Sequence, residues 1–256
     1  MKYLIAGTAR NISSTWSNVQ LSLEKIFSVI DSYDMVIVES NSEDNTLDLL
    51  RTWGLGKQNI KIISMGNLEG SRTQRISRCR NEYLKYITDH DYLLVVDLDD
   101  ILNVQNNFKE QLNSCFSRND WDCIASNRVD KYYDIWALRS YELGIDFDCW
   151  EMVNKYDITK SIYKEFRKMT NKYAITKIIQ RKLRKIPPHR EKYVDKFMIN
   201  IPQNSKWILC ESAFGGMALY KTSAIKSKKY NGDKTCEHVE FNKGLRIFIN
   251  PYFLSG

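Results

Sequence analysis

The stretch that decides the fold is Tyr92-Leu93-Leu94-Val95-Val96-Asp97-Leu98-Asp99-Asp100. Its apolar run is far shorter than the roughly 20 residues of a membrane span and predicts a buried strand. Like charges placed side by side gain nothing for folding, because each carboxylate disfavours ionisation of the next. Carboxylates two residues apart, Asp97 and Asp99, fit a hard divalent ion that also holds a diphosphate, whereas Asp100 fits a helix cap.

Around this strand, the first half of the chain alternates short β-rich runs with helical patterns. The alternation predicts an α/β fold with a mostly parallel sheet flanked by helices. We expect strands at 2–6, 35–39, 60–64, 92–97 and 123–127, with helices around 23–30, 76–87 and 108–116. Ligands of such sheets bind beyond the carboxyl ends of the strands, so residues 7–11, 39–42 and 97–100 are candidates for function.

The region from about 132 to 207 has few strand signals and predicts a basic, largely helical insertion. Residues 151–196 hold 14 Lys and Arg against 5 Asp and Glu, whereas the whole chain has a net charge of +7. An apolar stripe at 170–186 fits either a helix packed with a solvated basic face or one that docks on an anionic membrane or glycan. Strands resume at 206–209, 216–220 and 246–249, where Asn250-Pro251 is expected to end the last one.

Composition narrows the class of protein. With 256 residues, 43% of them hydrophobic, and a mean hydropathy of −0.45, the chain predicts one soluble, cytoplasmic domain without a signal peptide. Six cysteines without a CxxC pair predict reduced core thiols. Because the basicity is confined to one segment, nucleic acid is not expected as a partner. The dinucleotide, P-loop, nucleophile-elbow and zinc-protease motifs are all missing from the sequence.

Several segments, in this order and spacing, resemble the GT-A-fold glycosyltransferases. They are ESNSEDNT (39–46), RISRCRN (75–81) and the Asp97-x-Asp99 pair after its strand. The segments YYDIWALR (132–139), SAFGGMALY (212–220) and CEHVEFN (236–242) are similar to fungal capsule-associated (CAP59-like) mannosyltransferases and to glycosyltransferases of large DNA viruses. We expect the chain to differ from the fungal enzymes in having no amino-terminal membrane anchor, and the 150–200 insertion is not covered by the resemblance.

This resemblance implies a metal-dependent hexosyl- or pentosyltransferase. Such an enzyme would move a sugar from a UDP- or GDP-sugar donor to a glycan or other hydroxyl acceptor, with Mn²⁺ or Mg²⁺ as cofactor. The nucleotide-sugar half would span about 1–130, and the acceptor side with the insertion about 131–256, within a single domain 1–256. Which sugar, nucleotide and acceptor are used stays open.

The resemblance also assigns the donor site. Asp99 would be the metal ligand proper, Asp97 would lie near the metal or ribose, and His238 would be a further ligand, as neutral imidazole suits Mn²⁺. Glu39 would accept hydrogen bonds from the nucleotide base or ribose.

Arg75 and Arg80 would balance the charge of the diphosphate, since arginine suits bidentate phosphate contacts. Five residues apart on a helix, they are roughly 140° apart around its axis. We therefore expect at most one of them, preferably Arg75, to face the site.

The sequence is less specific about which residue acts as the base and about which residues line the side of the site that binds the sugar acceptor. Glu211, Glu237 and Glu240 compete for the role of base in an inverting reaction, whereas a retaining reaction needs none. The acceptor side would be lined by Asp134, Trp136 and Arg139.

Two other functions are compatible with parts of the sequence. A sugar-nucleotide pyrophosphorylase shares the layout and the metal, but it would carry a glycine-rich, basic signature after the first strand, where GTARNI (7–12) stands instead. A non-catalytic module could use the basic segment 151–196 to bind an anionic partner.

Overall fold

In the computed structural model of the chain, the described residues are 1–99, 101–149, 151–155 and 189–256. Most of the basic segment, including the 170–186 stripe, lies outside the described residues, so what the sequence predicts for it stays a prediction. No helix within the described ranges is long and apolar enough to cross a lipid bilayer. All six cysteines are free and buried, as expected.

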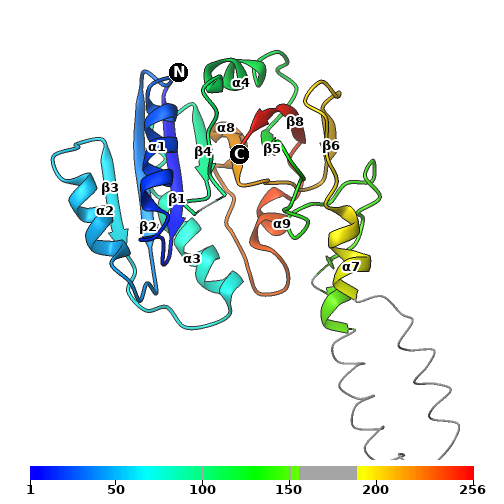
Figure 1. The fold of residues 1–256 in the computed structure, drawn as a ribbon, viewed down its shortest axis with the longest axis horizontal. Coiled ribbons are helices and arrows are strands. Elements are labelled where there is room, and N and C mark those ends of the chain that lie inside the picture. Colours follow the sequence, from blue (N-terminus) through cyan, green and yellow to red (C-terminus); the bar gives the residue numbers. More distant parts are fainter. Residues whose placement is uncertain (100, 150, 156–188) are drawn as a thin grey trace, which may run out of the picture.

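The eight described strands form one sheet in the order β3-β2-β1-β4-β7-β5-β8-β6 (Figure 1). Their bounds are β1 Tyr3–Ala9, β2 Tyr33–Glu39, β3 Ile60–Ser64, β4 Tyr92–Val96, β5 Cys123–Asn127, β6 Ile208–Cys210, β7 Met217–Lys221 and β8 Ile247–Leu254. Only β7 and β6 run antiparallel to their described neighbours, so the sheet is mostly parallel. The predicted α/β class with helices beside the sheet is confirmed.

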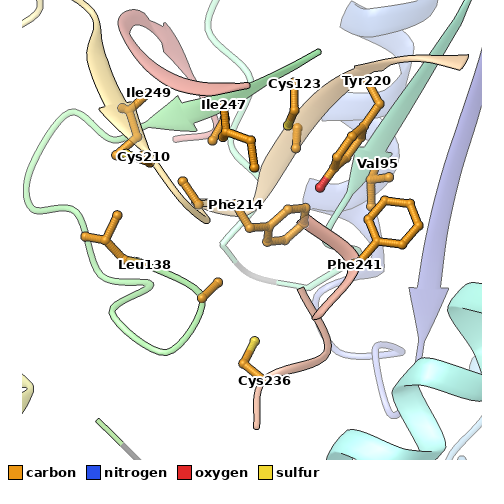
Figure 2. Packing of buried hydrophobic residues seen from close by; sticks show 14 of the residues in the cluster. Val95, Cys123, Leu138, Cys210, Phe214, Tyr220, Cys236, Phe241, Ile247 and Ile249 are labelled. Atoms are coloured by element: carbon orange, nitrogen blue, oxygen red, sulfur yellow. The ribbon is translucent and has the colours of Figure 1, made fainter. Parts of the chain in front are cut away.

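Helices pack on both faces of the sheet. They are α1 Trp16–Phe27, α2 Thr46–Gly54, α3 Arg72–Leu84, α4 Phe108–Ser114, α7 His189–Tyr193, α8 Thr222–Ile225 and α9 Glu237–Asn242, with a 3₁₀ turn at Asp195–Phe197. The core residues of α1, α2 and α4 belong to one apolar cluster, and those of α3 and α9 to the other. Figure 2 shows the second cluster, where Val95 of β4, Tyr220 of β7 and Phe241 of α9 come together.

Strand β4 is the element that both clusters share. Leu93 and Val95 belong to one cluster and Leu94 and Val96 to the other, and all four are 0% exposed. Side chains alternate across a strand, so a run that is apolar at every position is suited to a sheet covered on both faces. The prediction of a buried strand is therefore confirmed, and the structure shows that both of its faces are covered.

Two sequence predictions in the second half were wrong. Strand β8 continues through Pro251, because the pairing shifts from Ser126 with Asn250 to Asn127 with Leu254 and leaves the proline in a bulge. A proline lacks the N–H that a regular ladder needs, and a bulge removes that requirement. Residues 132–148 form turns and isolated bridges rather than the start of a helical insertion, and helical residues begin only at Cys149.

Helix α3 begins at a capping box. The side chain of Ser71 accepts a hydrogen bond from the Gln74 N–H, and the Gln74 side chain accepts one from the Ser71 N–H. Such reciprocal caps satisfy two backbone donors that the first turn leaves free. The cap fixes the start of the helix that carries Arg75 and Arg80.

Gly215, in the loop before β7, provides a test of how closely that loop packs against β5. Its φ is +71°, and a Cβ there would lie 2.2 Å from the Ser126 carbonyl oxygen. We predict that Gly215→Ala lowers the free energy of unfolding by about 2–5 kcal/mol, combining a left-handed conformation with overpacking. Gly244→Ala is the control, because Gly244 has φ +77° but open space around it and should cost only about 1–2 kcal/mol. If urea denaturation shows that the two variants lose equal amounts of unfolding free energy, the close packing around Gly215 is contradicted.

Candidate functional site

A cleft of about 330 Å³, here called the central cleft, lies at the carboxyl ends of β1 and β4. It is lined from the loops after these strands, from Ser40 after β2, from one side of α3, from residues 133–136, from Phe214 and from the start of α9. This is the edge of the sheet where ligands of such folds bind. A larger hollow of about 730 Å³ near His90 and Lys221 contains none of the predicted site residues.

The central cleft brings together most of the side chains that the sequence predicted for function. These are Arg75, Arg80, Asp97, Asp99, Asp134, Trp136, Glu237 and His238. They come from four separate stretches of the chain. The tertiary fold, and not their spacing in the sequence, therefore brings them together.

Arg80 lies at the centre of the charged groups. Its side chain is 5% exposed, with Nε 3.2 Å from Glu237 Oε1 and Nη2 3.5 Å from Asp97 Oδ1. The guanidinium also lies over the rings of Phe214 and Tyr230, at 5.1 and 5.6 Å from their centroids. Arg80 is the only buried Lys or Arg among the described residues.

The expectation that only one of the two arginines would face the site, preferably Arg75, was wrong. Both line the central cleft, and Arg80 is the one that contacts its carboxylates. Arg75 is half-buried and donates to the Gly70 carbonyl from Nη1, at 2.8 Å. Side chains of this length can reach one cleft from positions well separated around a helix, so the angle between Cβ atoms is a poor guide.

The acidic side chains of the central cleft outnumber its buried cation. Burial raises the pKa of Asp97 to about 7, with Asp99, Asp134 and Glu237 adding to the rise and Arg80 opposing it. Burial likewise raises the pKa of Asp134 to about 6, against the hydrogen bonds it accepts from backbone N–H groups. The cleft therefore favours any ligand that brings positive charge to these carboxylates.

His238 is buried beside these carboxylates without a hydrogen-bond partner for either ring nitrogen among the described residues. Its ring stacks on Phe214 at 4.0 Å between centroids and meets the edge of Tyr230 at 5.6 Å. Burial, and then the charge of Arg80, hold the pKa of His238 well below its ordinary value. The imidazole is therefore neutral and keeps a lone pair, as a metal ligand requires.

These groups fit a divalent ion that takes part of its coordination from a ligand. Among the described residues, no three His, Cys, Asp or Glu side chains are placed to hold a metal by themselves. Mg²⁺-like ions, however, are often held by one or two carboxylates together with substrate phosphates. Asp97, Asp99 and His238, whose Nε2 lies 3.9 Å from Glu237 Oε1, supply donor atoms for such an ion. Four arginines line the same cleft, Arg10, Arg72, Arg75 and Arg80.

Four predicted site residues lie outside the lining of the central cleft, and one of them, Glu240, is exposed. Glu39 is 3% exposed and accepts hydrogen bonds from the Ser42 N–H at 3.0 Å and the Ser64 hydroxyl at 2.7 Å. Arg139 pairs with Asp148 at 2.9 Å, and the exposed Glu211 donates its backbone N–H to the Arg139 carbonyl. Glu39 thus ties together the loops after β2 and β3.

The sequence did not single out two aromatic residues of the central cleft. Tyr133 donates its hydroxyl to Asp97 Oδ2 at 3.4 Å, and Phe214 forms the stacking surface for His238. Both stand in segments that carry the resemblance, but aromatic residues in such runs are usually core, and only the tertiary structure separates the two roles.

Comparison with solved structures shows which known proteins share this architecture. Mannosyltransferase PcManGT from Pyrobaculum calidifontis, solved with GDP-Man and Mn²⁺, matches over 98% of this chain with a TM-score of 0.52 and 10% identity. Residues 1–349 of TarS from S. aureus match over 97% with a TM-score of 0.51 and 14% identity, and TarS has also been solved with UDP-GlcNAc.

The chain has the GT-A glycosyltransferase fold. It spans 55% of the PcManGT chain and 58% of the TarS chain, so little more than half of each is matched. The sequence matches no protein-family model and no curated protein. Within the GT-A fold, the central cleft lies next to the Asp97-Leu98-Asp99 turn at the end of β4.

The raised pKa of Asp97 predicts how the free energy of unfolding of the protein without added metal depends on pH. A group with a pKa of about 7 when folded and 3.8 when unfolded contributes stability that is complete below about pH 4 and is lost as the pH rises through 7. Asp97→Asn cannot titrate, so the unfolding free energy of the wild type should fall relative to this variant by about 2–3 kcal/mol between pH 5 and pH 8. The exposed Asp146→Asn serves as control, and a constant difference between wild type and Asp97→Asn would contradict the prediction.

Proposed function

We propose that this chain is a metal-dependent glycosyltransferase that moves a sugar from a nucleoside-diphosphate donor to a hydroxyl acceptor. The observation that carries the proposal is the composition of the central cleft. Four arginines suited to a diphosphate meet a cluster of carboxylates at the ligand-binding edge of a GT-A sheet, together with a histidine that has no hydrogen-bond partner among the described residues.

Each group of side chains has a part in binding the donor. Arg75 and Arg80 would contact the diphosphate, and Asp97, Asp99 and His238 would hold Mn²⁺ or Mg²⁺. When bound, the ion would supply Lewis acidity that neutralises the diphosphate as it leaves the sugar. Glu39 would act on the nucleoside indirectly, by fixing the loop that carries Ser40.

A carboxylate is needed as base only if the reaction inverts the anomeric centre. Of the three candidates, Glu237 lines the central cleft, whereas Glu211 and Glu240 do not, so we retain Glu237. Its contact with Arg80 would have to loosen for it to take a proton. Trp136 remains on the acceptor side, since it lines the cleft and aromatic faces suit sugar rings.

The identity of the donor is proposed from the sequence resemblance and from the ligands of similar solved structures. The resemblance of residues 132–139 and 236–242 to CAP59-like mannosyltransferases favours GDP-mannose, and PcManGT was solved with that donor. TarS was solved with UDP-GlcNAc, so UDP-sugars belong in the same comparison.

A thermal-shift experiment tests the proposal. At a hundredfold excess over Kd, a donor that binds only the folded state stabilises it by about 2.7 kcal/mol, which corresponds to a rise in Tm of about 5–10 °C. We predict such a rise for GDP-mannose or a UDP-sugar with Mn²⁺, and little or none with EDTA. Asp99→Asn should abolish the Mn²⁺-dependent rise, whereas Asp146→Asn should retain it.

Two results would overturn the proposal. One is the lack of any shift with nucleoside diphosphates or their sugars in the presence of Mn²⁺. The other is an equal shift in EDTA and in Asp99→Asn, which would show that binding uses neither the metal nor the carboxylate.

A further inference from the structure

Asp134 differs from the other carboxylates of the central cleft in how it is held. Its Oδ1 accepts a hydrogen bond from the Ala137 N–H at 3.3 Å, and its Oδ2 accepts one from the Gly215 N–H at 3.2 Å. Within the described ranges it forms no ion pair, whereas Asp97 and Glu237 both contact Arg80. Two backbone groups from separate segments therefore fix its position without neutralising its charge.

The carboxylate of Asp134 keeps capacity for a ligand. An ionised carboxylate offers about four lone-pair sites, and the two backbone N–H groups occupy two of them. Asp134 lines the central cleft together with Tyr133. A fixed acceptor beside an aromatic side chain matches a sugar ring, which presents hydroxyl donors at its edge and C–H groups on its faces.

The position of Asp134 relates it to the donor rather than to a distant acceptor. It is close enough to Asp97, Glu237 and Arg80 for their charges to interact with its own. In the proposed function these side chains surround the diphosphate and the metal, and the group attached to the diphosphate is the sugar that is transferred.

We infer that the Asp134 carboxylate accepts hydrogen bonds from hydroxyls of the transferred sugar and so determines which donor sugar the enzyme prefers. This inference rests on the proposed function. It moves Asp134 from the acceptor side, where the sequence placed it, to the donor sugar. The binding energy it supplies belongs to the sugar part of the donor and not to the nucleotide.

Calorimetric titration of the full chain with Mn²⁺ separates these contributions. GDP is compared with GDP-mannose, and UDP with UDP-glucose, on wild type and Asp134→Asn. The variant should bind the free nucleotides within about twofold of wild type, but the preferred donor roughly tenfold to a hundredfold more weakly, as expected for lost hydrogen bonds to a charged group. Asp148→Asn is the matched control, because Asp148 is also a partly buried, bonded carboxylate but lies outside the lining of the cleft.

Deoxy donors give a second measurement that a structural role would not reproduce. Removing one hydroxyl from the sugar of the preferred donor should weaken wild-type binding at the position that Asp134 contacts. The same deoxy donor should bind Asp134→Asn no worse than the complete donor does, because the partner of that hydroxyl is already gone.

The outcomes are distinct. Equal weakening of nucleotide and donor in Asp134→Asn would overturn the inference, as would unchanged binding of both, which would return Asp134 to the acceptor side or to folding. If wild type binds neither nucleotides nor donors with Mn²⁺, the proposed function fails and the inference fails with it.

Discussion

The constraint on which the site depends is the gathering of four carboxylates around a single buried guanidinium. Asp97, Asp99, Asp134 and Glu237 all line one cleft, and Arg80 alone contacts two of them from within the protein. Burial makes this arrangement unfavourable for the charged forms, as the raised pKa values of Asp97 and Asp134 indicate. Such a cluster adds nothing to stability, and this is the physical ground on which we propose a ligand that balances its charge.

The fold is organised to hold that cluster. Strand β4 is covered on both faces and ends directly in the Asp97-Leu98-Asp99 turn, which fixes the carboxylates to the most buried part of the sheet. The neighbouring strand β7 follows the Gly215 loop, whose backbone N–H holds Asp134 in place. Helix α9 then delivers Glu237 and His238 from the far end of the chain. Rigid elements thus support the side chains of the site, as preorganised binding requires.

Strong local signals in the sequence predicted the fold and the centre of the site. Apolar runs gave most of the strands, and the paired carboxylates after β4 lie in the cleft as expected. The failures share one cause, which is that tertiary context overrode a local rule. A bulge accommodates Pro251 inside β8, and long side chains bring both Arg75 and Arg80 into the same cleft. Glu211 stands close to a glycine loop of the cleft in sequence, yet its side chain is exposed and lies outside the lining of the cleft.

A crystal structure of the chain grown with Mn²⁺ and GDP-mannose or a UDP-sugar would test the central claim most directly. The account predicts an anomalous manganese peak at the Asp97–Asp99 end of the central cleft, with His238 or a carboxylate among its ligands and the diphosphate beside Arg75 and Arg80. A nucleotide bound in another part of the molecule, or a diphosphate in the cleft without a metal peak, would contradict it.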